Sequence, residues 1–154
     1  MPRKRWKQLQ LFKHMHHNQL HKNMHDAGLL MLRIGFAFFM IPHGMAKLDR
    51  YMASLSSQEP LKFFNFLGLG PEISLWLTLV AELLAPVLLI VGFKTRWSAA
   101  VAAFCMAVAG FWIHRADPLE EKEHALLYFV AFTVMALTGP GRWSLDTIWR
   151  KQRD

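Results

Sequence analysis

Cysteine is almost absent from this chain, and Cys105 is the single one among 154 residues. One cysteine cannot form an internal disulfide or a C-x-x-C pair, so dithiol–disulfide chemistry carried by this chain alone is excluded. The sequence also lacks a glycine-rich flavin or nucleotide fingerprint, so any electron or hydride donor has to be another protein. No short apolar segment of a signal peptide lies near Met1, and we therefore expect no cleavage.

Acidic residues are scarce relative to basic ones. The chain has 11 Asp and Glu against 18 Lys and Arg, which gives a net charge of +7. A basic chain often binds nucleic acid, but here the positive charge lies mostly outside the apolar runs. A membrane topology explains this distribution better, so we expect contact with a lipid bilayer and no nucleic-acid partner.

Long apolar runs dominate the rest of the sequence, at residues 27–41, 73–91, 98–113 and 125–137. The second run would span about 28 Å as a helix, close to a hydrocarbon core of roughly 30 Å. The first and fourth runs are short and need flanking residues to reach this length. We predict an all-α fold, a four-helix transmembrane bundle with up-down topology.

The distribution of basic residues predicts the orientation of this bundle. Of the 18 Lys and Arg, 12 lie in the N-terminal segment, the link 92–97 and the C-terminal tail, and 5 lie in the loops 44–72 and 114–123. The positive-inside rule then places both termini in the cytoplasm. We divide the chain into a basic, His-rich juxtamembrane segment, a membrane domain and a cytoplasmic tail, at residues 1–26, 27–147 and 148–154.

Glu82 is the only formal charge in the second run and lies near its middle. A carboxylate in lipid costs at least ~2.5–3.5 kcal/mol, so Glu82 should face other helices and have a partner. Pro86, four residues later, has no N–H and frees the carbonyl of Glu82. Arg33 lies at a similar predicted depth, and we expect an Arg33–Glu82 ion pair.

Polar residues end or begin the spans on the predicted outer side. We expect them to gather above Glu82: His43, Lys47, His114, Glu123 and His124. Histidine titrates near neutrality, so such a funnel suits proton-coupled chemistry on a small hydrophobic ligand. A quinone would fit, with its ring between helices and its carbonyl oxygens bound by His or Arg.

Other interpretations of these residues remain open. The histidines and the ion pair could be purely structural, or His43 and His114 could hold a haem, or these two with Glu123 could hold a metal. We assign no metal site. A second histidine cluster lies near the N-terminus, at His14, His16, His17, His21 and His25. Its i, i+4, i+8 spacing can hold a divalent metal, but we favour a solvated surface beside the membrane.

Several short motifs resemble the DoxX-like family of small bacterial membrane proteins. They are Arg33, Pro42-His43-Gly44-x-x-Lys47, Glu82 within AELLAP, Gly92-x-x-Thr95-Arg96, His114 and a closing segment from Leu137 to Asp146 that includes Thr138-Gly139-Pro140-Gly141. The resemblance covers about residues 28–147. It implies a four-helix bundle in the bacterial plasma (inner) membrane, and association with quinone-linked oxidoreductases of sulfur compounds or with thiol and oxidative-stress systems.

We therefore predict the membrane subunit of a quinone-linked oxidoreductase, fed with electrons by a redox partner protein. The predicted catalytic residues are Glu82, Arg33, His43 and His114, and the predicted quinone contacts are His43, Lys47 and Glu82. A small transporter using the same polar axis is one alternative. Another is a scaffold in which a small-residue stripe of the third span, including Gly110, packs helices or the protomers of a homo-oligomer.

Overall fold

A computed structural model describes residues 2–57 and 60–153, with side chains from residue 17 onward. In the described part of the chain, all regular secondary structure is helical and no strand occurs. The prediction of an all-α fold is therefore confirmed for these residues. The elements in chain order are α1 (Pro2–Ser57), η1 (Phe66–Gly68), α2 (Pro71–Leu79), η2 (Val80–Leu84), α3 (Ala85–Val91), α4 (Thr95–Ala107), η3 (Val108–Ile113), α5 (Leu119–Thr138) and α6 (Leu145–Lys151).

Three helical stretches of the described chain are long and apolar enough to cross a membrane: His17–Ser57, Pro71–Val91 and Thr95–Ile113. They contain the first three predicted runs. The fourth run lies in α5, which starts at Leu119 and so includes the acidic turn with Glu120 and Glu121. Its charged first turns lower its hydropathy, so α5 is not among the three.

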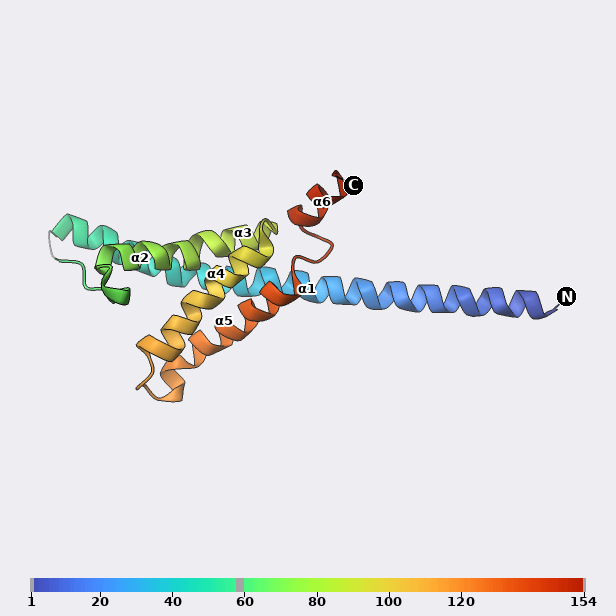
Figure 1. The fold of residues 1–154 in the computed structure, drawn as a ribbon, viewed down its shortest axis with the longest axis horizontal. Helices are drawn as coiled ribbons and strands as arrows, with labels where there is room; N and C mark the ends of the chain where they lie inside the picture. Colours follow the sequence, from blue (N-terminus) through green and yellow to red (C-terminus); the bar gives the residue numbers. More distant parts are fainter. Residues whose placement is uncertain (1, 58–59, 154) are drawn as a thin grey trace.

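Helix α1 is much longer than predicted. It passes through Pro42 as one helix and ends only at Ser57, so half of the predicted connection 44–72 is helical. Residues after Pro42 keep an apolar helical pattern, and no second proline or glycine pair interrupts it. The N-terminal half of α1 projects far beyond the other helices, as Figure 1 shows.

The other long helices fold back on the second half of α1. The continuous stretch α2–η2–α3 runs along α1, and α4 leads away from its end to a sharp turn, from which α5 returns beside α4 (Figure 1). Alanine and a few large side chains fill the centre: Ala37, Met40, Ala85, Leu89, Ala99, Ala102, Met106, Phe132 and Met135. A Cβ on Gly110 would lie 2.9 Å from Cδ2 of Leu126, so the small-residue stripe packs against α5 of the same chain.

The closing segment and the first turn of α6 contact the link between α3 and α4. The carboxylate of Asp146 accepts hydrogen bonds from the backbone N–H groups of Lys94 and Thr95, each at 2.8 Å. These are free donors at the start of α4, so Asp146 acts as its cap from a distant part of the sequence. A Cβ on Gly92 would lie 2.6 Å from Cβ of Ser144, which requires glycine at this contact. The closing motif thus has a structural role.

Candidate functional site

Glu82 lies in a π-helical turn, η2, where the N–H of Ala85 bonds to the carbonyl of Val80. Such turns insert an extra residue into an α-helix and often occur at functional sites. The whole residue is only 3% exposed, so the carboxylate is turned into the protein rather than toward lipid. Gly44 of α1 packs here, because a Cβ on it would lie 2.9 Å from the carbonyl oxygen of Glu82.

The partner of Glu82 is Lys47, and the predicted Arg33–Glu82 ion pair is wrong. Nζ of Lys47 lies 2.5 Å from Oε2 of Glu82, and the two side chains are 27% and 5% exposed. Helix α2–α3 runs along α1 so that Glu82 faces the segment around Gly44 and Lys47. Lys47 is 14 residues beyond Arg33, about 21 Å along a helix, which puts Arg33 out of reach.

Arg33 is buried at the opposite end of this contact. Its Nη1 and Nη2 donate to the carbonyl oxygens of Pro140 and Trp143, each at 2.5 Å. These carbonyls belong to the closing segment, so Arg33 ties α1 to the chain that follows α5. Arg33 therefore positions the closing segment and does not belong to the site around Glu82.

A cavity of about 310 Å³ opens next to the Lys47–Glu82 pair, between α1, η2, α4 with η3, and α5. Its lining includes four of the residues that were expected to gather with Glu82: His43, Lys47, His114 and His124. Glu123, the fifth, is not among its lining residues, and Glu121 takes part instead. The structure thus brings together His43, Lys47, Glu82 and His114 and leaves Arg33 outside.

Tyr128, Met40 and Met106 also line this cavity and were missed in the sequence. Tyr128 lies one turn after His124 in α5, so helical spacing could have found it. The two methionines are apolar, so a search of the sequence for polar residues could not identify them. They add apolar surface to a lining of ionisable groups, which suits a ligand with an apolar ring and polar edges.

Neighbouring side chains orient two of the imidazoles. His43 meets Tyr128 edge-on, with ring centroids 5.8 Å apart, and Tyr128 stacks on Phe132 at 5.9 Å. His114 follows a second π-helical turn, where its N–H bonds to the carbonyl of Ala109, and its Nδ1 lies 2.6 Å from Oδ2 of Asp117. An imidazole held in this way keeps its other nitrogen for a ligand or a proton.

Metal ligation has less support from the geometry. In the part of the chain with described side chains, no group of three or more His, Cys, Asp or Glu is placed to hold a metal ion. In the N-terminal cluster, the Nε2 atoms of His17 and His21 lie 2.9 Å apart on an exposed surface. The side chains of His14 and His16 lie outside the described residues.

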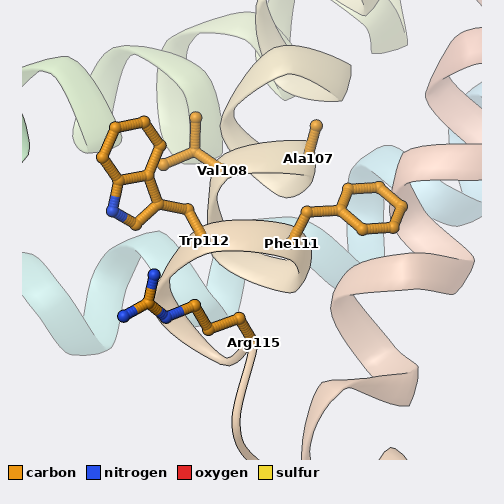
Figure 2. Close-up of a pocket in the computed structure, with 5 residues that line it drawn as sticks. All are labelled: Ala107, Val108, Phe111, Trp112 and Arg115. Atoms are coloured by element: carbon orange, nitrogen blue, oxygen red, sulfur yellow. The ribbon is translucent and has the colours of Figure 1, made fainter.

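A second hollow of about 490 Å³ lies on the outer side of η3. Figure 2 shows Trp112 and Arg115 extending to one side of the helix and Phe111 to the other. Both aromatic side chains are more than half exposed. An aromatic ring beside an arginine is typical of the boundary between lipid and water. We interpret this hollow as membrane-facing surface, because it gathers no set of convergent polar groups.

Comparison with known proteins decides the family. The DoxX family model matches residues 28–115, more than half of the chain and the part that carries His43, Lys47, Glu82 and His114. The chain belongs to the DoxX family. No solved structure matches it.

Relatives of this DoxX protein include an uncharacterised protein of Haemophilus influenzae, 30% identical over 131 residues that cover 80% of this chain and 92% of the relative. The inner membrane protein YqjF of Escherichia coli K12 is 25% identical over 137 residues, 85% of this chain and 98% of its own. With the apolar helices, these findings identify the DoxX protein as a multi-pass inner membrane protein whose helices contact the lipid bilayer.

Proposed function

We propose that this DoxX protein is the membrane subunit of a quinone-linked oxidoreductase system. The observation that carries the proposal is the Lys47–Glu82 ion pair at the wall of a cavity that three histidines also line. Reduction of a quinone to a quinol takes up two electrons and two protons. The cavity offers ionisable groups for the protons beside an apolar wall for the ring.

The roles follow from position. His43 and His114 hydrogen-bond the quinone oxygens and exchange protons with them, and Lys47 adds a cationic donor. Glu82 holds Lys47 in place and compensates its charge inside the protein. The electrons come from a partner protein, since the chain has no nucleotide or flavin fingerprint. The family resemblance points to a donor that oxidises sulfur compounds or thiols.

The proposal includes a topology of four spans with both termini in the cytoplasm. Helix α5 has 20 residues, about 30 Å, which is sufficient to cross a hydrocarbon core. Exposed tryptophans support two boundary levels, since Trp97 and Trp143 lie near the α3–α4 link and Trp112 lies at the far end of η3. The cavity then opens toward the exterior side.

Binding of a short-chain ubiquinone analogue to the protein in lipid nanodiscs tests this function. We expect Glu82→Gln and His43→Phe to weaken binding at least tenfold, because each removes a polar group at the cavity. His21→Ala is the matched control, since His21 is exposed and lies outside the cavity. Absence of binding by the wild type, or equal binding by Glu82→Gln, would refute the proposal.

A transporter is the second candidate, because the same cavity joins a buried ion pair to an opening. Flux of a small solute into proteoliposomes that stops in Glu82→Gln, in protein that binds no quinone, would favour transport. A scaffold role for the small-residue stripe is less supported, because Gly110 packs on Leu126 within one chain.

A further inference from the structure

Helix α1 carries an apolar repeat that the cavity does not explain. From Leu20 to Leu55, apolar residues recur at alternating intervals of four and three: Leu20, Met24, Ala27, Met31, Ile34, Phe38, Ile41, Met45, Leu48, Met52 and Leu55. This spacing is an uninterrupted heptad repeat, the pattern of a helix that pairs with another helix along one seam.

The repeat faces away from the chain's own core. Met24, Met31 and Phe38 are 64%, 78% and 63% exposed. The buried residues Asp26, Arg33 and Met40, also seven apart, lie on a different face of α1, which packs against the other helices. Only Ile41 and Leu48 of the repeat are half-buried. One chain therefore covers the inner face of α1 and leaves the heptad face open.

Lipid accounts for only part of this open face. The repeat occupies residues 20–55 of α1, about 54 Å of helix, whereas a hydrocarbon core is roughly 30 Å thick. At one end of the repeat, Leu20 and Met24 alternate with polar His21, Lys22, Asn23 and His25. At the other end, Met52 and Leu55 alternate with Asp49, Arg50, Ser54 and Ser56. The polar neighbours place these ends outside the hydrocarbon core, where exposed apolar side chains are unfavourable.

We propose that the heptad face of α1 binds the same face of a second copy, in a parallel and in-register pair of helices. Two copies in one membrane have the same orientation, so their α1 helices run parallel, and each position of the repeat meets its equivalent. The repeat exposes on the order of 1,000 Å² of side chain per chain, comparable to the roughly 800 Å² that each partner contributes to a stable interface.

Two glycines flank the repeat and fit this pairing. Gly28 and Gly35 are seven residues apart, and a Cβ on either would meet no other part of the chain within 4 Å. Glycine beside a membrane seam lets two helix backbones approach closely. No lysine or arginine occupies a repeat position, so no like charges meet along the seam. This proposal is independent of the quinone site.

Cysteine cross-linking in native membranes tests the pairing directly. In a Cys105→Ser background, Met24→Cys and Met52→Cys should form disulfide-linked dimers on mild oxidation, because equivalent seam positions meet at a separation that a disulfide can bridge. Lys22→Cys and Arg50→Cys are matched controls, exposed and at the same depths but off the repeat. Cross-linking several-fold stronger at the two repeat positions supports the pair. Equal cross-linking at all four positions, or none, overturns it.

A mass measurement in lipid nanodiscs gives a second, independent test of the pairing. Wild-type protein should be dimeric, and Gly28→Leu with Gly35→Leu should shift it to monomer with unchanged helix content. Ala46→Leu, exposed on α1 but off the repeat, should remain dimeric. A monomeric wild type, or a dimer that persists in the double variant, would contradict the proposal.

Discussion

At the residue scale, Glu82 and Arg33 satisfy their buried charges in different ways. Glu82 forms an ion pair with a lysine of α1, whereas Arg33 donates to two backbone carbonyls of the closing segment. A buried charge needs hydrogen-bond partners, but the partner does not have to be an opposite charge at the same depth in the membrane. The sequence therefore indicated correctly that both residues are buried and partnered, and the Arg33–Glu82 pairing it suggested was wrong.

Lys47→Met should destabilise the protein more than Glu82→Gln. The lysine change leaves a buried carboxylate without a counter-charge and should cost about 3 kcal/mol, near the lower end for broken buried pairs because Lys47 is partly exposed. Glu82→Gln leaves a lysine that can reach water and should cost about 1 kcal/mol. Unfolding in mixed micelles measures both variants. The double variant should recover part of the loss, and equal costs for the two single changes would contradict this assignment.

Arg33→Met should loosen the closing segment without affecting the cavity. Losing its two charge-assisted hydrogen bonds should cost about 2–3 kcal/mol and speed protease cleavage between residues 139 and 144. Its effect should add to that of Glu82→Gln within about 0.5 kcal/mol, because the two residues share no partner. A clearly non-additive double variant, measured by the same unfolding method, would restore the idea of a direct Arg33–Glu82 contact.

At the element scale, π-helical turns and glycine contacts place the site. Glu82 lies within the π-helical turn η2, and His114 directly follows the π-helical turn η3. Gly44 lets α1 approach the first of these turns closely. Apolar runs predicted the helices themselves, but they carry no signal for a widened turn. That feature depends on packing between helices and on Pro86, which removes one backbone donor.

Gly44→Ala should weaken the packing of α1 on η2. The added Cβ would lie 2.6 Å from Cγ of Leu83, so the helices must separate, at a cost of about 1–3 kcal/mol. The shift should also weaken binding of a quinone analogue, because Lys47 lies one turn further along α1. Ala46→Ser is the control, because Ala46 is exposed on α1 and off the heptad repeat, and its stability should be unchanged within about 0.5 kcal/mol. Equal stability of both variants would show that the contact at Gly44 has no strain.

At the scale of the whole molecule, the chain forms an inner bundle and one long projecting helix. The bundle forms the walls of the cavity. The N-terminal half of α1 extends beyond the bundle (Figure 1). A projecting basic helix with a heptad face suits association on one side of the membrane. The predicted side is the cytoplasm, since most lysines and arginines lie there.

The topology should be detectable by labelling in intact cells. In a Cys105→Ser background, Ala116→Cys should react with a membrane-impermeant maleimide, because the proposed topology places the turn between η3 and α5 on the exterior side. A fluorescent protein fused after residue 154 should fluoresce, as expected for a cytoplasmic C-terminus. Thr147→Cys provides the control and should react only after the cells are opened. Reaction of Thr147→Cys in intact cells would contradict the proposed topology and indicate the opposite orientation in the membrane.

The sequence alone determined the helical class, the location of the first three apolar helices and four of the polar residues that line the cavity with Glu82. These follow from local pattern, because hydropathy and helical spacing depend on neighbours in the chain. Only the tertiary structure decided that Lys47 pairs with Glu82, that Arg33 holds the closing segment and that Asp146 caps α4. Such pairings depend on how far one helix slides along another, and that register is set by side-chain packing rather than by composition.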